Sequence, residues 1–242
     1  MKRLQKLSFA LTAVSAAFIT ASASAQILAN DTVVINFTQT GNTAGENWNN
    51  VEGASGGTIS AGTLVGDLIR FSDGATTGVA LSIEGSGLGT DLFGIGGRTE
   101  PADPNRSFPA SGAIPDIAQQ NLTYHSDSPQ RFVFSGLDDS LTYNLSVLSA
   151  NTAGRNAHDW IANPGPDQVT ISVDPDDTLV HTFSDLLTDG SGNLVLENTT
   201  SGAGVDAQHL NAMELTAIPE PATYAALAGL LALGLVVLRR RR

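Results

Sequence analysis

Two tryptophans are the residues best suited to bind carbohydrate. Trp48 and Trp160 each offer a flat apolar ring that can pack against a pyranose while neighbouring polar groups bind its hydroxyls. Trp160 follows Arg155 and Asp159, which supply a donor and an acceptor. We therefore predict a glycan-binding loop with Trp48, Arg155, Asp159 and Trp160 as its candidate residues. The alternative is that both indoles pack in the core, which is the commoner role of this side chain.

An acidic turn is the candidate metal site. Asp174, Asp176 and Asp177 surround Pro175, and carboxylate oxygens are the ligands that calcium prefers. The segment lacks the glycine and the distal glutamate of an EF-hand loop. Calcium is thus the one cofactor that the sequence suggests, and a solvated acidic turn is the alternative.

No pattern in the chain indicates catalysis. Residues 53–57 match the G-x-S-x-G nucleophile motif, but neither a buried strand before them nor a helix after them is expected. The four histidines stand far apart (His125, His158, His181 and His209), without the spacing of metal ligands on one helix face. His181 alternates with Leu179 and Phe183, so we expect a hydrogen-bonded histidine on a core-facing strand. A non-enzymatic protein is predicted; the alternative is a secreted carbohydrate-active hydrolase or esterase.

The charge of the middle of the chain excludes nucleic-acid partners. Residues 26–218 contain 23 acidic residues and five arginines, which gives a formal net charge of −18. Nucleic-acid binding depends on Lys and Arg that neutralise phosphates. The chain also has no cysteine, so neither disulfides nor thiolate metal sites contribute to its stability.

Alternating apolar and polar residues predict an all-β fold. The clearest case is residues 141–147, where Leu141, Tyr143, Leu145 and Val147 share one face. Similar patterns occur in residues 33–37, 67–71, 79–83, 132–134, 169–173, 179–183, 194–196 and 208–215. Residues 85–128 read as a long loop region with one helical turn near residues 116–120. We predict a single β-sandwich with jelly-roll topology.

Several short segments resemble galactose-binding-like jelly rolls of exported proteins. They are Val34-Ile35-Asn36-Phe37, Asn47-Trp48-Asn49-Asn50, Phe134-Ser135-Gly136-Leu137-Asp138 with the following Leu141-Thr142-Tyr143-Asn144-Leu145, and Leu210-Asn211-Ala212-Met213-Glu214-Leu215. The resemblance implies the jelly-roll fold and carbohydrate binding, sometimes with a structural calcium. It assigns no ligand residue in this chain.

The N-terminal residues have the order of a secretory signal peptide. Lys2, Arg3 and Lys6 precede an apolar run, and Ala23-Ser24-Ala25 supplies a cleavage site before Gln26. We therefore expect a signal peptide over residues 1–25 and export of the following chain.

The C-terminal residues predict a membrane helix. Residues 222–238 hold 17 residues without a charge, close to the minimum of roughly 17 residues that can cross a bilayer as a helix. Arg239, Arg240, Arg241 and Arg242 follow, and such basic clusters stay on the cytoplasmic side. The main domain is therefore expected outside the cytoplasmic membrane.

The tail resembles a PEP-CTERM sorting signal. Pro219, Glu220 and Pro221 come first, then the apolar helix, then the arginine cluster. The resemblance implies that an exosortase removes the tail and releases the protein to the cell surface or the extracellular matrix. An anchor that is never cut is the alternative.

The sequence thus predicts three parts, a signal peptide (1–25), a β-sandwich domain (26–217) and a sorting signal (218–242). The exosortase, the inner membrane before processing, and polysaccharide are the predicted partners. The central domain is expected to bind polysaccharide or to act structurally.

Overall fold

The computed structural model describes residues 26–39, 41, 43–53, 59–60, 62–85, 94–97, 103–125, 130–149, 158–173, 179–200, 208–219, 229 and 239. Several predictions fall outside these residues. They are the signal peptide, Glu220, Pro221, the apolar stretch 222–238 except Gly229, Arg240 to Arg242, Arg155 and the acidic turn with Asp174, Asp176 and Asp177. Within the described part, no helix is long and apolar enough to cross a membrane.

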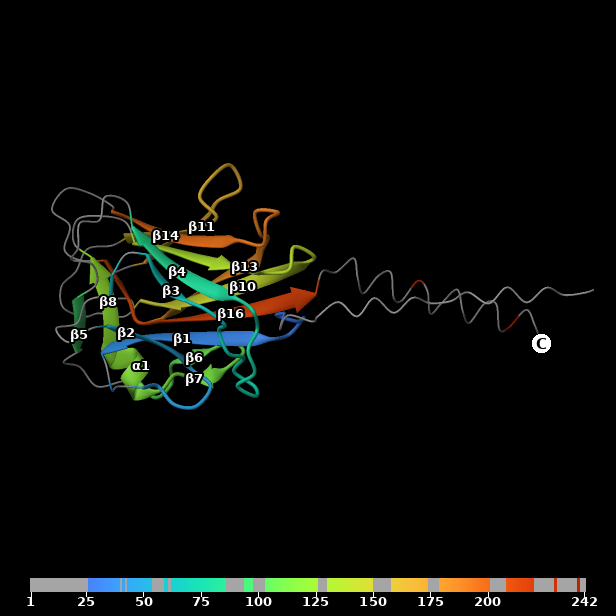
Figure 1. Ribbon diagram of the computed structural model, residues 1–242. Coiled ribbons are helices and arrows are strands. Elements are labelled where there is room, and N and C mark those ends of the chain that lie inside the picture. Colours follow the sequence, from blue (N-terminus) through green and yellow to red (C-terminus); the bar gives the residue numbers. More distant parts are fainter. Residues whose placement is uncertain are drawn as a thin grey trace, which may run out of the picture.

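Two sheets form the body of the protein. The five-stranded sheet runs in the order β13 (Val180–Leu186), β10 (Leu141–Leu148), β16 (Ala212–Pro219), β1 (Thr32–Gln39) and β2 (Asn49–Gly53). The six-stranded sheet runs in the order β12 (Val169–Val173), β11 (His158–Ala162), β14 (Leu194–Thr200), β9 (Gln130–Ser135), β4 (Ala80–Gly85) and β3 (Thr63–Val65). Figure 1 shows the first and last strands of the sandwich, β1 and β16, lying side by side as an antiparallel pair.

Smaller elements complete the chain. A three-stranded sheet has the order β15 (Gln208–Leu210), β8 (Asn121–His125) and β5 (Gly94–Gly97). A short hairpin joins β6 (Ser107–Phe108) to β7 (Gly112–Ala113), and helix α1 covers Asp116–Gln120. Figure 1 shows α1, β6 and β7 together beside β1.

The connections confirm the predicted sandwich. Strands β9, β11 and β14 belong to the six-stranded sheet, whereas β10, β13 and β16 belong to the other. The chain therefore crosses repeatedly between the two layers, as in a jelly roll. The one parallel pair among the described strands is β1 with β2.

The alternating residues fill the space between the sheets. Val33, Ile35 and Phe37 of β1 point inward and are buried, as are Tyr143 and Leu145 of β10. Pairing fixes this choice of face, because a shift by one residue would move every inward side chain outward. The period-two prediction for these strands is confirmed.

A second cluster covers the outer side of the five-stranded sheet. Val34 of β1 lies there with Trp48, Phe108 and Ala118. Glu214 of β16 is also buried at 2% exposure, and its carboxylate accepts hydrogen bonds from the backbone N–H groups of Ala110 (3.1 Å) and Ser111 (2.6 Å). These contacts hold the β6–β7 hairpin against the sheet.

Some sequence predictions of elements are wrong. Residues 67–71 form no strand but a loop with one isolated bridge, Ile69 to Thr76. Residues 208–215 are divided between β15 and β16 at Asn211. The region 85–128 holds the predicted helical turn as α1, but its described residues also form four short strands, β5 to β8, that the weak sequence pattern does not predict. His158–Ala162, expected as a loop, is a strand of the six-stranded sheet.

Candidate functional site

Trp160 lies in the core and cannot stack on a sugar. On β11, His158, Trp160 and Ala162 point inward, and the indole is 0% exposed. Its ring centroid lies 6.1 Å from that of Phe132 and 5.8 Å from that of His158. Burial of such a ring removes roughly 150–250 Å² from water, which stabilises the fold by about 4–6 kcal/mol. The prediction of a glycan-binding role for Trp160 is wrong.

Trp48 is also a packing residue. Its side chain is 7% exposed and lies in the outer cluster. The ring centroid is 6.4 Å from that of Phe108 on the β6–β7 hairpin. Because the hairpin covers the indole, Trp48 presents no face to a ligand, and its predicted binding role is wrong as well.

The remaining predicted site residues do not form a common site in the described part. Asp159 faces outward from β11 and accepts a hydrogen bond from the Ser172 hydroxyl (2.6 Å) on the neighbouring strand. Its predicted partner Arg155 is outside the described residues. No group of three or more His, Asp or Glu side chains in the described segments could hold a metal ion.

One serine–histidine contact lies between the sheets. Ser149 Oγ and His158 Nε2 are 3.1 Å apart, and both side chains are buried. This contact joins the end of β10 to the start of β11. Because both side chains are buried, Ser149 is not exposed to solvent as a nucleophile. His181 lies opposite Val147 of β10, on the side facing the core, and is half-buried.

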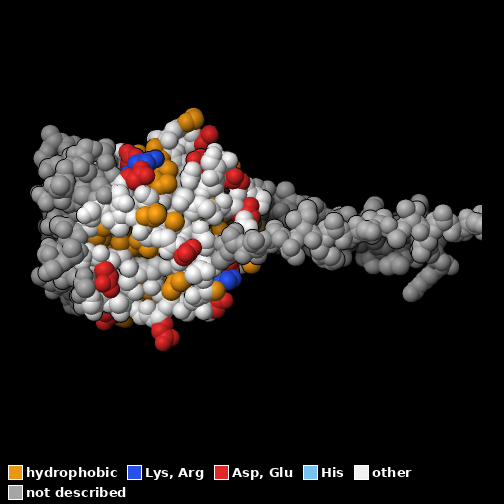
Figure 2. All heavy atoms as spheres, in the orientation of Figure 1, with side chains coloured by type: hydrophobic (Ala, Val, Ile, Leu, Met, Phe, Trp, Pro, Cys, Tyr) orange, Lys and Arg blue, Asp and Glu red, His pale blue; other side chains and the backbone are white. Residues whose placement is uncertain are grey.

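The outer face of the six-stranded sheet carries a polar ladder. Glu84, Arg131 and Glu197 stand in register on three adjacent strands, β4, β9 and β14. The Arg131 guanidinium forms ion pairs with both glutamates, and its Nε lies 3.6 Å from Glu197 Oε2. Figure 2 shows acidic side chains scattered over the face it presents and few basic ones.

An open cleft of about 590 Å³ adjoins this ladder. Its walls are the β11–β12 turn, the segment 185–189, and the outward side chains of β9 and β14. This volume is within the range of about 300–1,000 Å³ that is usual for ligand sites. Leu187 and Val169 border the cleft with 57% and 41% of their surface exposed, which gives it an apolar rim.

Asn163 holds the two walls of the cleft together. Its backbone has a φ of 48°, in the left-handed region that asparagine adopts more readily than most residues. Its side-chain Nδ2 donates to the Leu187 carbonyl (2.6 Å), and its Oδ1 accepts from the Val195 backbone N–H (3.1 Å). The Asn163 backbone N–H also donates to the Val195 carbonyl (2.8 Å). One side chain thus fixes Leu187 relative to β14.

A second set of hydrogen bonds fixes the far end of segment 185–189. Asp139 accepts from the Thr188 hydroxyl (2.5 Å) and from the Gly192 N–H (2.9 Å). The Asn193 side chain, and then the N–H groups of Ser191 and Asn193, lower the pKa of Asp189 below its ordinary value. The Asp189 carboxylate therefore stays charged at neutral pH and closes its own turn.

The cleft has an acidic lining. Four carboxylates border it, those of Asp167, Asp185, Asp189 and Glu197. Arg131 is the one cation among the described lining residues, and it is already paired. Such a cleft can bind hydroxyl or amino groups but repels carboxylated, sulfated and phosphorylated ligands. Sequence reasoning did not find this cleft, because its walls come from turns without a recognisable motif.

Comparison with known proteins gives distant structural likenesses only. No protein-family model matches the chain, and neither does any curated protein. The ANX1 ectodomain from Arabidopsis thaliana is similar at 13% identity and a TM-score of 0.40, over 64% of this chain and 54% of that chain. The present protein thus spans about half the length of that ectodomain.

Two solved carbohydrate-binding modules are also similar. For CBM35 from Cellvibrio japonicus Abf62 the identity is 14% and the TM-score 0.27, over 56% of this chain and 91% of that chain. The family 32 module from C. perfringens NanJ, solved with galactose, has 12% identity and a TM-score of 0.29, over 56% of this chain and 93% of that chain. At these values no residue role passes from one protein to another, and the cleft stands on its own geometry.

Proposed function

We propose that this protein is an exported, non-enzymatic β-sandwich that binds polysaccharide in the cleft beside Arg131. The observation that carries the proposal is the combination of an apolar rim with amide and carboxylate groups on a fixed frame. Sugars present apolar C–H faces and hydroxyl edges, so they need both kinds of contact. Because Asn163 fixes the position of Leu187, little ordering of the cleft opposes binding.

A polysaccharide array tests this function. The chain spanning residues 26–219, which includes every described strand and both core clusters, is applied with and without calcium. The same array is repeated with Leu187→Ala, which removes about 1 kcal/mol of apolar contact, or about fivefold in affinity. Leu64→Ala is the matched control, because Leu64 is 66% exposed on β3, at the opposite edge of the sheet from β12.

Each outcome of the array has a defined meaning. Specific binding that weakens in Leu187→Ala but not in Leu64→Ala supports the cleft as the binding site. A blank array in both conditions contradicts polysaccharide binding and favours a structural role in the matrix. Turnover of a polysaccharide or ester substrate by the chain would instead favour the hydrolase alternative.

The proposal includes sorting through the C-terminal tail. The argument for a signal peptide, an exosortase cut near Pro219-Glu220-Pro221 and delivery to the surface or matrix rests on the sequence pattern of the two ends. The intact mass of the exported protein tests it. A mass without residues 222–242 supports processing, whereas a mass that retains them indicates a permanent anchor.

A further inference from the structure

A second hollow lies on another part of the surface, beside a partly exposed aromatic ring. Among the Phe, Tyr and Trp side chains whose burial is described, only Phe71 is partly exposed. It lines a hollow of about 340 Å³ together with Asn30, Thr32, Ser72, Ala110 and Thr216. These residues come from β1, β16, the β6–β7 hairpin and two loops, and they are not part of the cleft beside Arg131.

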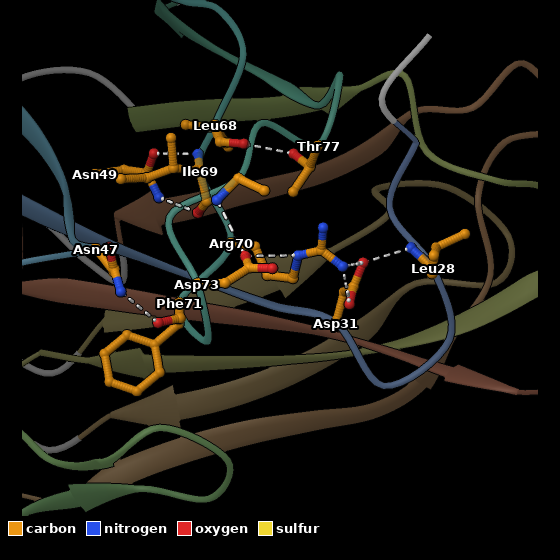
Figure 3. Close-up of polar contacts among 11 residues, drawn as sticks. Leu28, Asp31, Asn47, Asn49, Leu68, Ile69, Arg70, Phe71, Asp73 and Thr77 are labelled. Carbon is orange, nitrogen blue, oxygen red and sulfur yellow. Dashed lines mark hydrogen bonds and ion pairs between the residues drawn. The ribbon is translucent and has the colours of Figure 1, made fainter. Parts of the chain in front are cut away.

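The backbone around Phe71 is held on both sides of the ring. The Phe71 N–H donates to the Thr32 carbonyl (2.8 Å). Asn47 Nδ2 donates to the Phe71 carbonyl (3.1 Å; Figure 3). Two residues before Phe71, the Ile69 N–H donates to Asn49 Oδ1 (2.7 Å), and Asn49 Nδ2 donates to the Ile69 carbonyl (2.9 Å). The aromatic wall of the hollow is therefore fixed before any ligand arrives.

Apart from Ala110, the rest of the wall consists of neutral polar groups. Thr32 Oγ1 and Thr216 Oγ1 are 3.1 Å apart on paired strands, and either can donate to the other. Ser72 is exposed beside the ring. Asn30 has a φ of 71°, and its N–H donates to the Ala217 carbonyl (2.7 Å). This bond fixes the backbone position from which the Asn30 side chain extends. Hydroxyls and an amide thus surround an apolar ring face.

The neighbouring cation is already neutralised. Arg70 Nη1 lies 3.0 and 3.2 Å from the two Asp31 oxygens, and Arg70 Nε lies 3.1 Å from Asp73 Oδ1 (Figure 3). The hydrogen bond to Asp31 is the largest cause that raises the pKa of Arg70 above its ordinary value. With the guanidinium held by two carboxylates, the hollow offers no charge for a phosphate, sulfate or carboxylate ligand.

We infer that this hollow is a second carbohydrate subsite that takes one neutral pyranose residue. The C–H face of the sugar packs on Phe71, and its hydroxyls bind Asn30, Thr32, Ser72 and Thr216. An aromatic face with uncharged donors and acceptors around it matches a neutral sugar better than an ion or an apolar molecule. The inference goes beyond the cleft, because a second site would let one domain hold a polymer at two points.

A Phe71→Trp variant of the full chain provides the test. Trp48 and Trp160 are 7% and 0% exposed, so acrylamide quenches a new indole at position 71 preferentially. Neutral gluco-, galacto-, manno- and xylo-oligosaccharides are added up to about 30 mM, above the Kd of about 1 mM that corresponds to weak binding. We expect at least one neutral sugar to reduce the quenching by half or more, and oligouronates to have no effect. No protection by any neutral sugar, or stronger protection by oligouronates, overturns the inference.

A second pair of variants keeps the native ring. Ser72→Ala is expected to weaken neutral-sugar binding, followed by sugar-induced NMR shifts, about threefold, because one exposed hydrogen bond is lost. Ser184→Ala is the control, since Ser184 is an exposed serine on β13 that lines neither the hollow nor the cleft beside Arg131. Equal binding by both variants contradicts a role for the hollow.

The two sites are separated by repeating the quenching with Leu187→Ala in the Phe71→Trp background. Protection that persists shows a subsite independent of the cleft, even if the cleft itself binds nothing. Protection that disappears together with cleft binding overturns the independent subsite.

Discussion

Replacement of Asn163 gives a direct test of the cleft, because this residue contributes in two separable ways. Its side chain makes two hydrogen bonds, to the Leu187 carbonyl and from the Val195 N–H, and its backbone has a positive φ. Each hydrogen bond contributes about 0.5–1.5 kcal/mol. A left-handed backbone costs an ordinary L-residue about 1–2 kcal/mol, a cost that glycine does not have.

These magnitudes predict an order of stability. Asn163→Gly loses the two hydrogen bonds but keeps a permitted backbone, so the free energy of unfolding falls by about 2 kcal/mol. Asn163→Ala loses the same hydrogen bonds and adds backbone strain, so its free energy of unfolding falls by about 3 kcal/mol. For a domain of this size, 1 kcal/mol shifts the Tm by about 2–4 °C, which gives decreases of about 4–8 °C and 6–12 °C.

Thermal and urea unfolding followed by circular dichroism measure this order. The control is Asn105→Ala, which alters an exposed asparagine that bonds within its own turn and should change stability by no more than about 0.5 kcal/mol. An alanine variant as stable as the glycine variant would contradict the backbone contribution. If both match Asn105→Ala, Asn163 does not hold the walls of the cleft together, and the argument for a fixed Leu187 is refuted.

Three further predictions follow from other parts of the molecule. Gly136→Ala should lower the free energy of unfolding, measured in urea, by about 2–5 kcal/mol, because its φ is 79° and a Cβ would lie 2.6 Å from the Gly78 carbonyl oxygen. The control Gly190→Ala, at φ 80° with no atom within 4 Å of the added Cβ, should lower it by only about 1–2 kcal/mol. Equal decreases in the two variants would contradict the predicted steric overlap. Burial is the main cause that raises the pKa of Tyr143 to about 12. The neutral phenol therefore stabilises the fold below pH ~10, and this stability is lost as the pH rises from ~10 to ~12. Tyr143→Phe should reduce this alkaline decrease in Tm, and an unchanged decrease would contradict the role of Tyr143. Carboxylated polysaccharides should bind the cleft more weakly than their neutral parents at low salt, because its lining is acidic, and tighter binding of the carboxylated form would show that the charge argument fails.

Much of the fold follows from the sequence, because a half-buried strand leaves a local signal. Leu141 to Val147 alternate strictly, and β10 is found there with the predicted residues inside. Strands with fewer side chains to alternate, such as Gly94–Gly97, give no such signal, so the sequence does not predict them. The net charge of the central part and the order of features at the two ends are also properties of the sequence alone.

The face that each strand buries is a tertiary property. His158, Trp160 and Ala162 alternate with Asp159 and Ile161, a pattern that fits a strand, but the polar edges of His and Trp also fit an exposed binding loop. Pairing of β11 between β12 and β14 places the indole in the core. An alternating pattern defines two faces, and only the neighbouring strands decide which one is inside.

The candidate sites depend still more on tertiary contacts. Asn163 and Leu187 are 24 positions apart and meet because two turns adjoin the same end of β14. Phe71 meets Thr32 and Thr216, the latter from the last strand of the sandwich. The sequence by itself determined the β class, the acidity and the features of the two ends, because these are sums or local periodicities. Which polar and aromatic groups stand together was decided only by the packing of distant segments, since no local pattern records a contact between them.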